Sequence, residues 1–175
     1  MNELLVITAV GEDRPGIVDE LSQILFETDL NIADSRMSIL GGEFAIILLV
    51  SGKPDAIERI QQQQSQLENA LKLSIIIKPT KARHSSSDRV PYTIRVVGMD
   101  NPGIVHRLAR FLSQHNINIE DLETESYPAP HTGTPMFSVS MSVEIPTEVS
   151  IAKLRDEFTQ LCDEQNLDAQ FSPME

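Results

Sequence analysis

The amino-acid sequence predicts an α+β protein of two tandem βαββαβ domains, each an antiparallel sheet with its helices on one face. A shift of 87 residues aligns residues 11–34 with residues 98–121, and 11 of the 24 pairs are identical. Chance would give roughly one or two such identities. Within each copy, segments of alternating apolar residues and segments of helical periodicity follow one another in the same order.

The predicted elements of the first copy are a strand at 4–10, a helix at 15–25, strands at 31–39 and 43–51, a helix from 54 to 67, and a strand at 73–78. Pro15 stands near the first turn of the first helix, and Pro54 opens the second. Gly41 and Gly42 suit a tight hairpin turn between the two middle strands.

The second copy repeats this order, with a strand at 92–97, a helix at 103–115, strands at 117–127 and 136–145, a helix at 150–165, and a strand at 168–172. Its hairpin is longer, because the proline-rich residues 128–135 replace the Gly-Gly turn. The polar stretch between the copies is bounded by prolines, which is typical of a linker. We therefore expect a first domain at 1–79, a linker at 80–91 and a second domain at 92–175.

The two sheets differ in the face turned away from the helices. In the second copy, serines and Glu144 alternate with apolar residues along 136–145, which predicts one face in contact with water. In the first copy apolar side chains occupy that face, namely Val6, Val10, Ala45, Ile47 and Leu49. We hypothesise that this apolar face is covered, either by the second repeat or by another chain.

Composition and charge exclude several classes of function. The formal charge is −12 over 175 residues, which opposes direct binding to nucleic acid. The only cysteine, Cys162, excludes an internal disulfide and a Cys-x-x-Cys site, and we expect it to be a core thiol. The longest apolar run, residues 44–50, is too short to span a membrane. We expect a soluble cytoplasmic protein without a metal or cofactor, and no catalytic set of residues emerges.

The loop between the first strand and first helix of each copy carries the pattern Asp-x-Pro-Gly-Ile-Val. A helix N-terminus offers free amide groups and partial positive charge, so a carboxylate suits the amides that follow Gly16 and Gly103. Asp13 and Asp100 would then take an ammonium group. The same residues also form ordinary cap and turn chemistry, with Asp as the N-cap and Gly at a tight bend.

This loop, the Asn-Ile-x-Asp motif that follows, and the duplicated ferredoxin-like βαββαβ unit resemble ACT domains, the small-molecule sensing modules of amino-acid metabolism. The resemblance covers nearly the whole chain. It implies that the ligand-binding residues are Gly11, Asp13, Arg14, Pro15, Gly16, Ile17, Val18 and Asn31 in the first copy, and Gly98, Asp100, Asn101, Pro102, Gly103, Ile104, Val105 and Asn118 in the second. From the residues alone, Asn31 and Asn118 are read first as turn residues before a strand and second as polar groups near the pocket. Asn101 departs from Arg14.

Two such repeats without an attached catalytic domain are similar to stand-alone ACT repressors of transcription. That resemblance implies a non-enzymatic repressor of the glycine cleavage operon that restrains a LysR-type activator by binding it, with glycine relieving the restraint. It also implies a homo-oligomer, with a dimer favoured. The alternatives are an ACT sensor acting on an unidentified partner enzyme, and an acylphosphatase-like hydrolase. A hydrolase of that kind needs a phosphate-binding Arg with a water-positioning Asn, and Arg14 with Asn31 is the nearest match.

Overall fold

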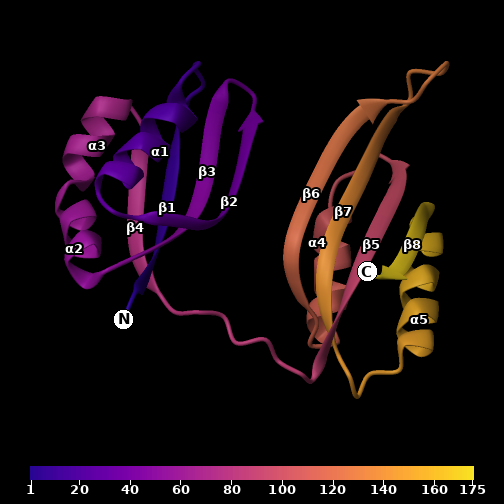
Figure 1. Ribbon diagram of the computed structural model, residues 1–175. Coiled ribbons are helices and arrows are strands. Elements are labelled where there is room, and N and C mark those ends of the chain that lie inside the picture. Colours follow the sequence, from indigo (N-terminus) through magenta and orange to yellow (C-terminus); the bar gives the residue numbers. More distant parts are fainter. The chain divides into compact units, whose positions relative to one another are not determined.

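The computed structural model describes residues 1–175, which divide into two compact units, Met1–His84 and Ser85–Glu175 (Figure 1). The first unit contains β1 (Glu3–Glu12), α1 (Ile17–Glu27), β2 (Asn31–Leu40), β3 (Glu43–Gly52), α2 (Pro54–Gln62), α3 (Gln64–Leu71) and β4 (Ser74–Thr80). The second contains β5 (Arg89–Met99), α4 (Ile104–Gln114), β6 (Asn118–Pro128), β7 (Pro135–Pro146), α5 (Ile151–Glu164) and β8 (Leu167–Pro173).

Each unit is a four-stranded antiparallel sheet, as the sequence predicted. The strand orders are β2-β3-β1-β4 and β6-β7-β5-β8, so the first strand of each βαββαβ unit lies at the centre beside the third. The helices of each unit cover one face of its sheet (Figure 1). Leu5, Ile7 and Ala9 of β1 point into the core beneath the helices, and the alternate residues of the strand point away from them.

Three details differ from the expected elements. The helix predicted from Pro54 to Leu67 is two helices that meet at Gln63, although no proline or glycine stands at the break. The first helix begins at Ile17 rather than at Pro15, because residues 15 and 16 form a turn. In the second unit β5 begins at Arg89, inside the expected linker, and pairs there with the end of β7.

The face of each sheet opposite its helices is here called the open face. On the first sheet it bears the apolar side chains of Leu4, Val6, Val10, Ala45, Ile47, Leu49 and Ile76. The corresponding face of the second sheet bears Ser138, Ser140, Ser142, Arg95, Gln170 and the acidic side chains of β6. The predicted contrast between an apolar and a polar face is therefore confirmed for residues on β1, β3 and β7.

The prediction that Cys162 is a core thiol also agrees with the structure. Cys162 is fully buried in the second core beside Phe158 and Leu154. Burial raises the pKa of its thiol to about 11, with a smaller contribution from the charge of Asp163. No helix of the chain is long and apolar enough to cross a membrane.

Candidate functional site

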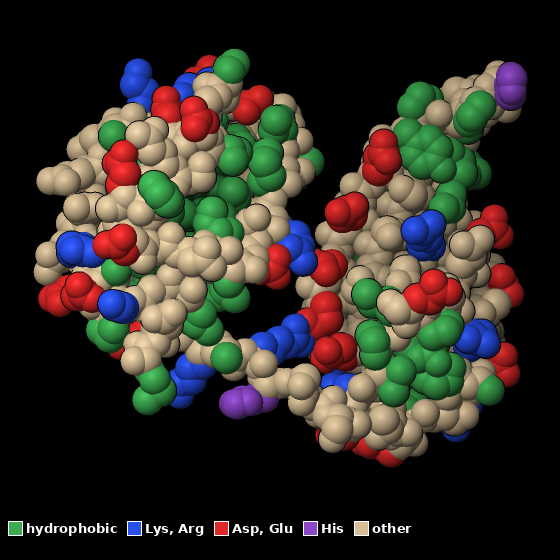
Figure 2. Space-filling view, viewed as in Figure 1, with side chains coloured by type: hydrophobic (Ala, Val, Ile, Leu, Met, Phe, Trp, Pro, Cys, Tyr) green, Lys and Arg blue, Asp and Glu red, His purple; other side chains and the backbone are tan.

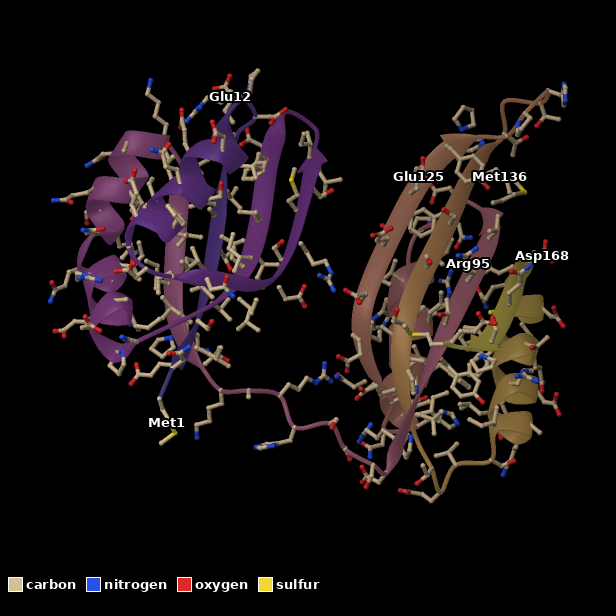
Figure 3. The ribbon with its side chains drawn as sticks, in the orientation of Figure 1. Met1, Glu12, Arg95, Glu125, Met136 and Asp168 are labelled. Atoms are coloured by element: carbon tan, nitrogen blue, oxygen red, sulfur yellow. The ribbon has the colours of Figure 1, made fainter.

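The two predicted ligand loops lie where the first strand of each domain leads into its first helix. Figure 3 labels Glu12 at this end of β1 and Met1 at the opposite end of the same strand. The amide of Asp13 donates to the carbonyl of Gly42 at 3.1 Å, and that of Asp100 donates to Pro135 at 3.0 Å. Each loop is therefore fastened to the hairpin between the second and third strands of its own domain.

A turn built on Pro-Gly sets the direction of the helix in both domains. Gly16 has φ 90° and ψ −3°, and Gly103 has φ 87° and ψ 8°. These angles are those of the third residue of a type II turn, which favours glycine there and proline just before it. Both glycines are the N-caps of their helices, and no side chain accepts a hydrogen bond from the first helical amides. The prediction that Asp caps the helix is thus wrong.

The first turn of each helix leaves backbone amides unpaired. In α1 the first amide to donate within the helix is that of Glu20, to the Gly16 carbonyl, and in α4 it is that of Arg107, to the Gly103 carbonyl. The amides of Ile17 and Val18, and of Ile104 and Val105, precede these and have no acceptor within the protein. Such amides, at the positive end of a helix, can bind a carboxylate.

In the first domain this positive end is already occupied by protein charges. Arg14 Nη2 lies 2.6 Å from Glu20 Oε2, and Arg14 also donates to the carbonyls of Pro15 and Leu71. The hydrogen bond from Arg14 lowers the pKa of the Glu20 carboxyl, so the pair stays ionised and its charges cancel. Asp19 and Glu20 both stand in the first turn of α1, where they offset the helix dipole.

In the second domain the same two positions carry a different pair. Asn101 replaces Arg14, and Arg107 replaces Glu20. Arg107 Nη2 donates to Asn101 Oδ1 at 2.6 Å, and Nη1 donates to the Pro102 carbonyl at 3.3 Å. Its Nε is buried without a hydrogen-bond partner, and no carboxylate contacts the guanidinium. The first turn of α4 contains no acidic residue.

The two loops therefore share a backbone and differ in charge. A guanidinium lies beside both helix N-termini, but only that of Arg107 is left without an acidic partner. Loop-centred sequence reasoning missed Glu20 and Arg107, because both lie in the helix beyond the Asp-x-Pro-Gly-Ile-Val pattern. The alignment of the two copies at a shift of 87 residues could have identified them, because it pairs the acidic Glu20 with the basic Arg107.

Two of the predicted ligand residues have a sufficient structural explanation. A Cβ at Gly11 would overlap the side chain of Leu73 and the carbonyl of Lys72, and a Cβ at Gly98 would overlap the side chain of Leu167. Glycine here allows the last strand of each domain to pass close to the first. Ile17 and Ile104 are likewise buried in the cores, so only their backbone amides face the loops.

Asn31 and Asn118 are not brought together with the loops of their own domains. Asn31 pairs with Ser51 at the start of β2, beside Leu4 of β1, whereas the loop follows Glu12. Leu4 and Gly11 are seven residues apart on β1, a separation of roughly 23 Å at the rise of a strand. Asn118 has the same place in the second domain.

Each of these asparagines lines a cavity at that opposite end. Asn31 belongs to a cavity of about 550 Å³ that also contains Asp29, Lys53 and Arg59, and Arg59 Nη2 lies 3.7 Å from Asp29 Oδ2. Asn118 belongs to a cavity of about 340 Å³ with Arg89 and Asn116. Nowhere does the chain gather three or more His, Cys, Asp or Glu side chains that could hold a metal ion.

Comparison with known proteins agrees with the duplicated fold. Residues 3–78 and 92–172 each match the ACT domain family. The glycine cleavage system transcriptional repressor of Escherichia coli (strain K12) is 32% identical over 93% of this chain and 85% of that protein. The crystal structure of an unknown protein from Galdieria sulphuraria is 30% identical, with a TM-score of 0.83 and complete coverage of both chains. A structure provisionally assigned as a glycine cleavage system transcriptional repressor is 26% identical, with a TM-score of 0.74 over 100% of this chain and 99% of that one.

Proposed function

The chain belongs to the ACT domain family, and we propose that it is an amino-acid-responsive regulator whose second loop binds a small amino acid, with glycine favoured. The observation that carries this proposal is the guanidinium of Arg107, which lies without an acidic partner beside the free amides of Ile104 and Val105. Together they offer positive charge and hydrogen-bond donors to a carboxylate. Asp100, exposed in the same loop, is available for the ammonium group.

The regulated process is proposed from the relatives. The E. coli protein, similar over 93% of this chain, is a transcriptional repressor of the glycine cleavage system. With a net charge of −12, this chain would be repelled by the phosphates of DNA. We therefore propose that it represses transcription of a glycine cleavage operon by binding a LysR-type activator, and that glycine weakens this complex. An ACT sensor acting on a partner enzyme is the alternative that keeps the same ligand site.

The fold separates Arg14 and Asn31, the two residues that the hydrolase alternative requires close together. Arg14 lies in the loop after β1 and is held by Glu20, whereas Asn31 begins β2 at the far end of the sheet. A phosphate bound at Arg14 would be roughly 20 Å from the amide of Asn31 in the same domain, too far to position a water. The geometry therefore favours binding over hydrolysis.

Calorimetric titration with glycine, and in parallel with serine, alanine and acetyl phosphate, tests the sensor. We expect saturable binding of glycine and no turnover of acetyl phosphate; hydrolysis without amino-acid binding would overturn the proposal. Co-sedimentation with the purified LysR-type activator, with and without glycine, tests the partner. We expect a complex that weakens as glycine is added. If the chain binds glycine but does not bind the activator, the alternative of a partner enzyme is favoured instead.

A further inference from the structure

The open face of the first sheet is apolar to an extent that the second sheet does not share. Ile47 is 49% exposed at its centre, Ile76 is 67% exposed on β4, and Val10 is 42% exposed on β1. Because exposed apolar surface of this kind favours burial, the face needs a partner of matching chemistry.

The strand register arranges this face in rows that cross the sheet. In one row, Asp34 on β2, Leu49 on β3, Val6 on β1 and Lys78 on β4 lie side by side. An acidic group thus stands at one edge of the row and a basic group at the other, with two apolar residues between them. No carboxylate of the chain pairs with Lys78, whereas Asp34 accepts a hydrogen bond from Arg36.

A two-fold axis that runs along the strands, between two facing copies of this sheet, would place β2 of one copy over β4 of the other. Asp34 would then oppose Lys78 of the second copy at both edges, while Leu49 would oppose Val6 in the middle. In the next row Arg36 would lie over Ile76, where its aliphatic stem can cover the exposed side chain. The row is therefore complementary to itself, as an isologous contact requires.

The polar open face of the second domain does not offer this match. Its middle rows carry Ser140 beside Arg95 and Glu125 beside Ser138, and Figure 3 labels Arg95, Glu125 and Asp168 on three of its strands. Acidic side chains line β6 in Figure 2. Apolar side chains packed on these groups would leave hydroxyls and charges without hydrogen bonds, which costs free energy.

We propose that the open face of the first sheet is an interface with the same face of a second copy of this chain, packed sheet on sheet. Four strands at about 4.8 Å and six residue steps at about 3.3 Å give roughly 400 Å² of plane for each copy. Two such faces give about 800 Å² of plane, which is below the roughly 1,200 Å² that stable specific interfaces bury and is in the range of weak, transient ones. A contact of this size is expected to give a weak dimer.

Sedimentation equilibrium of the full chain over a micromolar concentration series tests this interface. The variant Ile47→Ser/Ile76→Ser should weaken dimerisation roughly a hundredfold or more, because four isoleucines leave the contact. Both side chains are about half exposed or more, so the fold should persist, and thermal unfolding checks this. The matched control is Ser140→Ala/Gln170→Ala at the corresponding positions of the second sheet, which should leave the dimer intact.

A charge exchange tests the arrangement of the two copies. Asp34→Lys and Lys78→Asp should each weaken the dimer, and the double variant Asp34→Lys/Lys78→Asp should restore most of the loss. A wild-type chain that stays monomeric, or a dimer that survives Ile47→Ser/Ile76→Ser, would overturn the proposal. In the second case the exposed edge strand β2 would become the candidate contact. A double charge variant no better than the single ones would also contradict the two-fold arrangement. Glycine plays no part in these measurements, so their outcome is independent of the ligand site.

Discussion

Arg107 allows the proposed ligand site to be tested by a single substitution with an internal control. Arg107→Gln removes the guanidinium charge and keeps a side chain that can still donate to the Pro102 carbonyl. Arg14→Gln makes the same change in the first loop, where the lost charge was already balanced by Glu20 at 2.6 Å. The two variants therefore differ in whether they remove charge that is available to a ligand.

The expected loss of affinity follows from the contacts of Arg107. A hydrogen bond to a charged group contributes about 1.5 to 3 kcal/mol, and 1.4 kcal/mol is a factor of ten in affinity. Arg107 is only partly buried and two of its nitrogens already donate to Asn101 and Pro102, so the lower part of this range applies. We expect Arg107→Gln to weaken glycine binding roughly tenfold to thirtyfold.

Calorimetry of both variants and the wild type at one salt concentration measures this effect. Arg14→Gln should change the glycine dissociation constant less than about twofold. Thermal unfolding is the control, because a collapsed second loop would also lose the ligand. Equal weakening by the two variants, or weakening by Arg14→Gln alone, would show that the charge difference between the loops does not select the site.

Two further predictions concern the backbone and the buried thiol. Gly16→Ala should destabilise the chain by about 1 to 2 kcal/mol in urea unfolding, because an L-residue is strained at φ 90°, whereas Gly42→Ala, with open space around it, should be close to neutral. Cys162 should react with a thiol reagent at pH 8 only after unfolding, because its pKa is about 11 in the folded chain. The thiol ionises more readily once the chain is unfolded, so the free energy of unfolding should fall as the pH rises toward 11. Rapid labelling of the native chain would contradict both statements.

Much of the fold could be predicted from the sequence because each helix and strand of the repeat can be assigned twice, once in each copy. The strands and the contrast between the open faces rest on alternation that the sheet must obey, as Ile47 and Ser140 illustrate. The break at Gln63 could not be foreseen, because glutamine is a good helix former and nothing in residues 61–64 stops a helix. The start of β5 was missed because Pro91 marks a linker edge as readily as a strand end.

The candidate site was harder to predict, since a turn pattern and a ligand pattern share the same residues. Asp-x-Pro-Gly located both loops, yet the conformations of Gly16 and Gly103 follow from the turn alone. The charge that separates the loops comes from one helical turn further along, where Glu20 aligns with Arg107. Only packing in three dimensions shows that these side chains reach back over the loop.

The two domains differ in both of the surfaces proposed for interaction, and this difference predicts the number of ligands bound. The first domain combines an apolar open face with a loop neutralised by Glu20, whereas the second combines a polar face with the uncompensated charge of Arg107. One domain is therefore suited to association and the other to ligand binding. Calorimetry should accordingly give one glycine per chain. Two equivalent ligands per chain would mean that the backbone amides shared by both loops determine binding, and that the Arg14–Glu20 pair does not block the first.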